Sequence, residues 1–329
     1  MRFSEYMSEW LYGDNGYYLD IGQVGKAGDF LTSPSVSMFF GGAIANKFVS
    51  LVRSGILPRD SIVCEFGANS LYALKDFASF VAGLEPELLK TVKFVIVEKQ
   101  AKAADFQASE LKEFFADVDF GIVSELKGFE NRAAFVFANE IFDAFACELL
   151  HEGKFASVRE HKISFDMDDE ALLKKAQKLE ITKGEIALGY EEFAKELYSA
   201  FAKSYFVTFD YGQEYARNDF SVRIYKEHKN EPLFGVDNLG EYFANSDITY
   251  DVNFGHLARA FEDAGFDTID YKNQASALVN FGISELLEMY LKKVGEAAYL
   301  KEAAKAKALI APEGFGERFK MISFGKGIV

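Results

Sequence analysis

The chain has few of the residues that mark disulfide-rich, metal-binding or nucleic-acid-binding proteins. It contains 2 cysteines and 4 histidines in 329 residues. Cys64 and Cys147 flank predicted strands without metal-ligand spacing, so we expect buried free thiols in a reducing compartment and no metal. The formal net charge of −15 at pH 7 leaves no basic excess. That balance disfavours a nucleic-acid partner, whose phosphates would be repelled, and weakly favours a basic partner.

Long apolar segments are missing as well. The longest uncharged run, residues 30–46, is broken by a proline and several hydroxyl side chains, which makes it too polar to span a membrane. The first nine residues include two glutamates where a signal peptide needs an apolar core. We therefore expect a cytoplasmic protein without membrane insertion. The sequence does not predict its oligomeric state.

What the chain does have is a regular alternation of strand-like and helix-like segments. Strands are expected at 61–67, 92–98, 119–123, 135–138 and 204–210, with helices at 71–82 and 101–115 after the first two. This rhythm predicts an α/β fold with a parallel, doubly wound sheet. The tail adds a helix at 257–264, a strand at 266–271, helical sequence through 308 and a strand at 319–324.

Two regions do not follow the alternation. Residues 1–60 are expected to form a helical N-terminal segment, and residues 147–203 an inserted α+β region. The insertion should hold a hairpin over 147–165 with its turn at Glu152-Gly153, then a helix over 191–203. The predicted domains are therefore 1–60, a core of 61–146 with 204–329, and the insertion 147–203.

The segment Ala134-Phe-Val-Phe-Ala-Asn-Glu-Ile-Phe-Asp143 is the most informative part of the chain. A short apolar run indicates a strand buried on both faces, and it stops at Asn139, Glu140 and Asp143. Ligands of open α/β sheets bind outside the carboxyl ends of the strands. An amide and two carboxylates there could hold a cationic substrate. Capping of a following helix is an equally good interpretation of these residues alone.

The first two expected strands end like those of a nucleotide site. Glu65 and Gly67 close the first strand and Glu98 closes the second. An acid at the second position can accept hydrogen bonds from ribose hydroxyls, although a solvated strand-end acid is an equal alternative for Glu98 alone. The dinucleotide fingerprint and a glycine-rich phosphate loop are both missing. An adenosyl cofactor without phosphates therefore fits better than NAD or ATP.

The chain resembles the MidA-type S-adenosylmethionine-dependent methyltransferases along nearly its whole length. The pieces that carry the resemblance are Gly16-Tyr-Tyr18, Gly28-Asp-Phe-Leu-Thr-Ser-Pro34, Phe40-Gly41, Glu65-Phe-Gly67, Glu98, Asn139-Glu-Ile-Phe-Asp-Ala144, Asp210-Tyr-Gly212, Arg223-x-Tyr225-x-x-His228, Asp247-Ile-Thr249 and Phe281-Gly-Ile283. The resemblance implies a Rossmann-like class I methyltransferase fold. Mitochondrial members of the family assist assembly of respiratory complex I, and one is a protein arginine methyltransferase.

The same resemblance implies S-adenosyl-L-methionine as cofactor and a protein substrate that presents an arginine, with a complex I subunit as the first candidate. Residues 1–60 would cover the cofactor, and its contacts would come from Gly28, Asp29, Phe30, Thr32, Ser33, Glu65, Gly67, Asn69 and Glu98. Without the resemblance, residues 28–34 would be interpreted as an ordinary turn and helix cap.

One departure from the family lies in the loop after the first strand. The family has Gly-x-Gly-x-Gly there, whereas this chain has Gly67-Ala-Asn-Ser-Leu71. Asn69 can adopt the left-handed backbone of a glycine, though less freely. The alternative to a methyltransferase is therefore a non-catalytic assembly factor that keeps the fold with a degenerate cofactor loop.

The expected chemistry is transfer of a methyl group from a sulfonium to a guanidinium. Such a displacement depends mainly on alignment and proximity. Glu140 and Asp143 are the candidates for holding the guanidinium, because carboxylates pair with its planar fork. Asn139 is expected nearer the cofactor.

Overall fold

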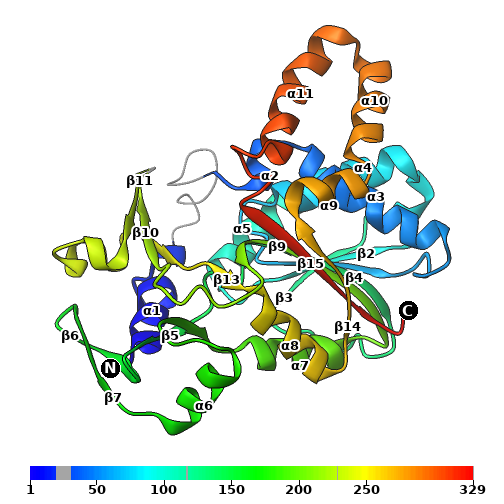
Figure 1. The fold of residues 1–329 in the computed structure, drawn as a ribbon. Coiled ribbons are helices and arrows are strands. Elements are labelled where there is room, and N and C mark those ends of the chain that lie inside the picture. Colours follow the sequence, from blue (N-terminus) through cyan, green and yellow to red (C-terminus); the bar gives the residue numbers. More distant parts are fainter. Residues whose placement is uncertain (20–30, 116–117, 228, 329) are drawn as a thin grey trace. The chain divides into compact units, whose positions relative to one another are not determined.

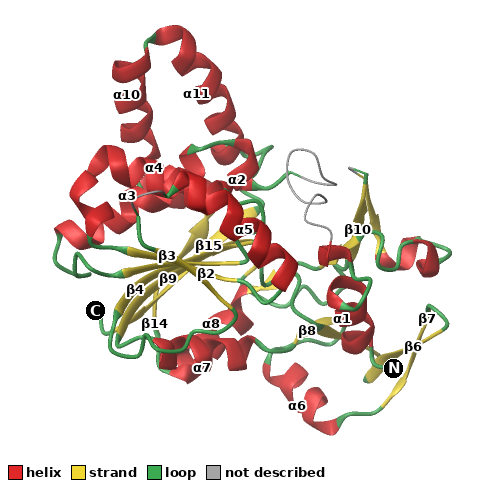
Figure 2. Cartoon of the chain, turned by 180° about the vertical axis from the view of Figure 1, so that it is seen from behind, coloured by secondary structure: helices red, strands yellow, loops and turns green. Residues whose placement is uncertain are grey.

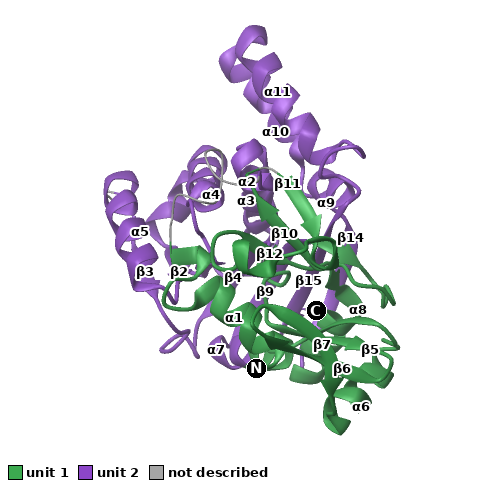
Figure 3. Ribbon diagram, turned by 90° about the vertical axis from the view of Figure 1, so that its left-hand side faces the viewer, with its two compact units in different colours: residues 1–30, 141–195, 211–264 green, residues 31–140, 196–210, 265–329 purple. Residues whose placement is uncertain are grey.

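The computed structural model describes residues 1–19, 31–115, 118–227 and 229–328 (Figure 1). The chain forms two compact units, coloured separately in Figure 3. Unit 1 consists of Met1–Phe30, Ile141–Lys195 and Tyr211–Ala264, and unit 2 of Leu31–Glu140, Glu196–Asp210 and Gly265–Val329. These units group the residues differently from the three predicted domains, whose boundaries stay a prediction.

Unit 2 holds the methyltransferase-like sheet. Its helices are α2 (Ser33–Val36), α3 (Phe39–Arg53), α4 (Tyr72–Leu84), η3 (Pro86–Lys90), α5 (Ala101–Phe114), α9 (Gln274–Asn280), α10 (Ile283–Val294) and α11 (Glu296–Ile310). Its strands are β1 (Ile62–Phe66), β2 (Lys93–Val97), β3 (Phe120–Val123), β4 (Ala133–Asn139), β14 (Asp267–Asn273) and β15 (Phe319–Lys326). Helix α7 (Tyr190–Ala200) and strand β9 (Lys203–Gln213) run across the boundary between the units.

The strands are ordered β14-β15-β9-β4-β1-β2-β3. The five strands from β3 to β9 are parallel, and β14 pairs antiparallel with β15. Helices α3, α4 and α5 lie along one face of these strands (Figure 2). The predicted Rossmann-like class I fold, with a helical N-terminal segment and an α+β insertion, is confirmed.

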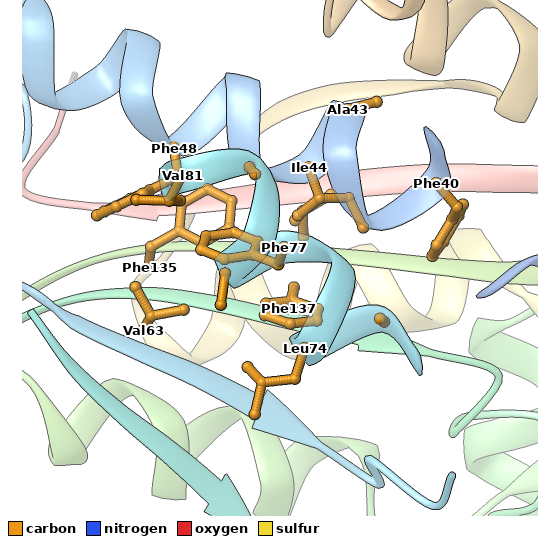
Figure 4. Packing of buried hydrophobic residues seen from close by; sticks show 14 of the residues in the cluster. Phe40, Ala43, Ile44, Phe48, Val63, Leu74, Phe77, Val81, Phe135 and Phe137 are labelled. Atoms are coloured by element: carbon orange, nitrogen blue, oxygen red, sulfur yellow. The ribbon is translucent and has the colours of Figure 1, made fainter. Parts of the chain in front are cut away.

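Aromatic packing between the sheet and two helices builds the core of unit 2. The Phe77 ring of α4 stacks on the Phe137 ring of β4 with centroids 5.4 Å apart, and Phe48 of α3 meets Phe77 and Phe135 (Figure 4). Gly41 lets α3 approach α4, because a Cβ there would lie 2.6 Å from the Ala73 carbonyl oxygen. These packed rings fix the strands whose ends carry the candidate site.

Unit 1 is built from smaller sheets and helices. Its helices are α1 (Phe3–Tyr12), η1 (Tyr17–Leu19), α6 (Glu170–Lys178), η4 (Leu233–Gly235), η5 (Leu239–Glu241) and α8 (Phe254–Ala264). Its strands are β5 (Cys147–His151), β6 (Lys154–Arg159), β7 (Lys162–Met167), β8 (Gly184–Ala187), β10 (Arg223–Lys226), β11 (Lys229–Pro232), β12 (Asp247–Thr249) and β13 (Val252–Asn253). They form a four-stranded sheet, β7-β6-β5-β8, and a three-stranded sheet, β11-β10-β12, while β13 pairs with the end of β9.

The expected hairpin turn of unit 1 is confirmed. Glu152 and Gly153 both have positive φ, 49° and 77°, as the favoured two-residue hairpin turns require. The hairpin continues into a third antiparallel strand, β7. Cys64 and Cys147 are buried free thiols, and among the described helices none is long and apolar enough to cross a membrane.

Candidate functional site

The register of three parallel strands brings the predicted cofactor residues to one edge of the sheet. Phe66 of β1 is level with Val97 of β2 and Ala138 of β4. The residues that follow these three in the chain are Gly67, Glu98 and Asn139, respectively. The structure therefore brings these three sequence-predicted positions together at the carboxyl ends of adjacent strands, where open α/β sheets bind ligands.

The loop after β1 keeps a glycine-like backbone although it has lost two glycines. Gly67, Asn69 and Leu71 have φ values of 65°, 35° and 64°. These are the positions that the family pattern fills with glycine. A left-handed backbone costs an ordinary residue roughly 1–2 kcal/mol, so Leu71 must be held there by other interactions. Its side chain is fully buried in the core of unit 2, and it is the N-cap residue of helix α4.

Burial of Leu71 outweighs its strain. Leu71→Gly should lower the free energy of unfolding by up to about 4 kcal/mol, because loss of a buried leucine costs about 2–5 kcal/mol and relief of the left-handed backbone returns about 1–2 kcal/mol. Asn69→Gly should change stability by less than about 1 kcal/mol and leave cofactor affinity within about threefold. Urea unfolding and calorimetry measure both. A tenfold gain in affinity for Asn69→Gly would show that asparagine distorts the loop.

Glu98 is held by a residue that the sequence interpretation missed. Its Oε1 accepts from the backbone N–H of Gln100 at 2.9 Å, and its Oε2 accepts from Nε2 of Gln107 at 3.2 Å. The same Nε2 lies 3.4 Å from the carbonyl oxygen of Asn69. Gln107 thus joins the acid at the end of β2 to the loop after β1. No sequence signal identified Gln107, because its burial on the same face of α5 as Leu111 is visible only in the structure.

The link between Gln107 and Glu98 should appear as coupling in cofactor binding. Glu98→Ala should weaken S-adenosylmethionine binding by about 1.5–3 kcal/mol, as for loss of hydrogen bonds to a charged group. Gln107→Leu should weaken it by about three- to tenfold in the native background and by much less in the Glu98→Ala background. Calorimetry on the four proteins measures this cycle. Additive effects would contradict a shared role.

Glu65 is a buried acid within β1. Its side chain is 4% exposed, and its Oε2 has no hydrogen-bond partner within the described ranges. Burial raises the pKa of Glu65 from 4.5 to about 8. A neutral carboxyl at this position could pair with a cationic group of a ligand by losing its proton.

A raised pKa predicts proton release when a cation binds beside Glu65. Without ligand, native Glu65 keeps its proton to higher pH than in the unfolded chain, so its contribution to stability falls as the pH rises from about 4.5 to about 8. At pH 7, the native protein should release up to about one proton more than Glu65→Gln on binding S-adenosylmethionine. Calorimetry in buffers of different ionisation enthalpy gives this number. Equal release by both proteins would place the cofactor's ammonium elsewhere.

Asn139 and Glu140 form a fixed pair where β4 ends. Glu140 has a left-handed φ of 52° and donates its N–H to the carbonyl oxygen of Phe209 at 2.8 Å. Nδ2 of Asn139 donates to Oε1 of Glu140 at 2.7 Å. Oδ1 of Asn139 is buried without a partner in the part of the chain that the structure describes. Unusual backbone of this kind is common at functional sites.

Asp143 lies in unit 1 and is 4% exposed. Burial raises the pKa of Asp143, while hydrogen bonds from Tyr211 and from backbone amides oppose the rise. Its own carbonyl oxygen accepts from Tyr250 N–H at 3.2 Å.

The alternative that Asn139, Glu140 and Asp143 cap a following helix is wrong, because turns lead from β4 directly into β5.

The predicted covering residues are placed only in part. Gly28, Asp29 and Phe30 lie outside the described residues. Thr32 precedes α2, and its N–H donates to Oγ of Ser35 at 3.0 Å. Ser33 is fully buried and donates its hydroxyl to Oε1 of Gln274 on α9 at 3.1 Å. That bond ties α2 to α9, while contact of Thr32 or Ser33 with a cofactor stays a prediction.

The strand order, and an acid at the end of β2 beside a left-handed loop after β1, define a class I methyltransferase. Residues 43–272 match the model of a family described as "Putative S-adenosyl-L-methionine-dependent methyltransferase". The chain belongs to this family. It is an S-adenosyl-L-methionine-dependent methyltransferase, as the resemblance implied, and its cofactor is S-adenosyl-L-methionine.

Curated relatives match over nearly the whole chain. "Protein arginine methyltransferase NDUFAF7, mitochondrial" of Rattus norvegicus is 23% identical over 96% of this chain and 79% of its own length. The Mus musculus protein of that name is 24% identical with the same coverages. Both relatives thus extend beyond the part that aligns with this chain.

Solved structures show the same fold. A Burkholderia thailandensis protein bound to S-adenosyl-homocysteine has a TM-score of 0.82 at 22% identity, covering 100% of this chain and 88% of that one. A second structure from this organism has a TM-score of 0.81 at 24% identity with equal coverage. These likenesses support the fold assignment.

Proposed function

We propose that this enzyme transfers the methyl group of S-adenosylmethionine to an arginine of a partner protein. The observation that carries the proposal is the Asn139–Glu140 pair, a carboxylate beside a buried amide oxygen without a partner among the described residues. A guanidinium offers several N–H donors in a rigid plane and suits both acceptors. The arginine methyltransferase names of the mammalian relatives support the same acceptor.

The proposed cofactor contacts follow from the groups at the strand ends. Glu98 accepts hydrogen bonds from the ribose hydroxyls, and the loop from Gly67 to Leu71 passes beside the cofactor. Glu65 faces its ammonium, since Oε2 is buried and lacks a partner in the described chain. Gly28, Asp29, Phe30, Thr32 and Ser33 are proposed to close over the cofactor, on the family resemblance alone.

In the proposed reaction, a guanidinium nitrogen attacks the methyl carbon in line with the bond to sulfur. The N–C bond forms as the C–S bond breaks, and the electron pair of the C–S bond stays on sulfur. The attacking nitrogen loses one proton. Glu140 orients the guanidinium by charge-assisted hydrogen bonds and can accept that proton. We assign Asp143 a second contact with the acceptor. Holding the reactants in line is the main contribution of the protein.

The acceptor and the compartment are further proposals. A complex I subunit is the first acceptor to test, because the family resemblance implies it. The cytoplasm is the proposed location, supported by the two free thiols, and cell fractionation tests it.

Loss of the carboxylates should separate chemistry from cofactor binding. Glu140→Gln and Asp143→Asn should each lower methyl transfer at least tenfold, which needs only about 1.4 kcal/mol of lost transition-state stabilisation. Affinity for S-adenosylmethionine should stay nearly unchanged. The measurement is transfer of radiolabelled methyl groups to a lysate of a strain that lacks this protein, followed by amino-acid analysis for methylarginine.

Glu180→Gln is the matched control, because Glu180 also has a left-handed φ, 57°, on the exposed surface of unit 1. It should leave transfer unchanged. Label on a residue other than arginine would overturn the proposed acceptor. Full transfer by both carboxylate variants would remove Glu140 and Asp143 from the reaction.

A further inference from the structure

Unit 1 carries a group of four aromatic side chains that come from segments far apart in the sequence. The group consists of His151 of β5, Phe165 of β7, Phe220 of the loop after β9 and Phe234 of η4; we call it the aromatic cluster. Ring centroids of Phe220 and Phe234 are 4.7 Å apart, and those of Phe165 and Phe220 are 5.7 Å apart. His151 lies 5.3 Å from Phe165. The four rings therefore form one continuous chain of contacts.

The aromatic cluster is open to solvent. Phe234 is 48% exposed, and the other three members are partly exposed. It also adjoins a sheet edge, because β7 is the terminal strand of the four-stranded sheet. Exposed aromatic groups beside a strand edge are typical of surfaces that bind another chain.

The charges near the aromatic cluster favour a cationic occupant. Nζ of Lys183 lies 5.1 Å from the centroid of the Phe220 ring, so a ring of the cluster already accepts a cation on its face. That lysine is neutralised by Asp219 at 2.6 Å. Lys154, close in sequence to His151, is likewise paired with Asp168 at 2.8 Å.

Acids without such partners accompany the cluster. The exposed acids that neighbour its members in sequence and make no ion pair within the described chain are Glu152, Glu231 and Asp237. The imbalance extends to the whole unit. Unit 1 has 15 Lys and Arg against 27 Asp and Glu, a net charge of −12, whereas unit 2 has 21 against 24, a net charge of −3. Most of the negative charge therefore lies on the unit that carries the aromatic cluster.

We propose that the aromatic cluster is a docking surface for a basic, arginine-containing segment of the protein that this enzyme methylates. The ring faces take guanidinium groups by stacking and cation–π contact, and the unpaired acids attract the segment from a distance. The inference rests on the proposed function, since it names the kind of acceptor segment that the enzyme recognises. We give the cluster a role in binding the acceptor and none in the chemical step.

The first measurement is binding of a fluorescein-labelled peptide of eight residues, alternating arginine and glycine, by fluorescence anisotropy. Phe234→Ser should weaken binding at least fivefold, and Glu231→Gln with Asp237→Asn should weaken it and reduce its salt dependence. A matching peptide of glutamate and glycine should not bind.

Phe114→Ser is the matched control. Phe114 is 42% exposed on α5 of unit 2, and Nζ of Lys75 lies 5.8 Å from its ring centroid. This variant should bind the peptide like the native protein. Equal weakening by Phe114→Ser and Phe234→Ser would overturn the proposal, because it would show that loss of any exposed phenylalanine weakens binding.

The second measurement is methyl transfer to lysate proteins as their concentration varies. Phe234→Ser should raise the apparent KM for the acceptor at least fivefold, while kcat and the affinity for S-adenosylmethionine stay unchanged. Native KM for Phe234→Ser would overturn the docking surface and leave arginine methylation standing. If the native enzyme labels no arginine, the proposed function fails, and the docking inference, which rests on it, is overturned as well.

Discussion

The parallel register of β4, β1 and β2 is the constraint on which the candidate site depends. Each of these strands is an apolar run buried within unit 2, so none can slip by one residue without turning core side chains toward the other face. Their carboxyl ends consequently stay level. That register alone makes neighbours of the residues at their ends, which are Gly67, Glu98 and the pair Asn139–Glu140.

The same packing explains how the loop tolerates residues that its backbone disfavours. The handedness of L-amino acids opposes φ near 60° by roughly 1–2 kcal/mol, whereas full burial of a leucine contributes about 1.5–3 kcal/mol. The two quantities are close, and burial is the larger. The buried side chain of Leu71 therefore holds the loop in place, whereas a glycine at this position would leave the backbone freer to move. A loop of this kind keeps its shape in the absence of ligand, so less ordering is needed when the cofactor binds.

Much of the sheet could be predicted from sequence, because its strands are short apolar runs ended by polar residues. The expected strand at 92–98 became β2 over Lys93–Val97, and the acid after it lies at the predicted edge. Gln107 could not be assigned in this way, since its role depends on contacts with Glu98 and with the Asn69 backbone that only the fold creates. The β10, β11 and β12 strands were missed because they have only 4, 4 and 3 residues, too few to show a periodic pattern, and β11 is exposed throughout.

Three unsatisfied polar atoms indicate why the site should be more stable with its ligand than without it. Glu65 Oε2, Gln107 Oε1 and Asn139 Oδ1 are buried and lack partners among the described residues, and all three belong to the group of residues around the ends of β1, β2 and β4. A buried acceptor without a donor costs about 1–3 kcal/mol. Ligand ammonium, hydroxyl and guanidinium groups are donors of the kind these oxygens lack. Part of the binding free energy of cofactor and acceptor can thus come from satisfying acceptors that folding leaves open.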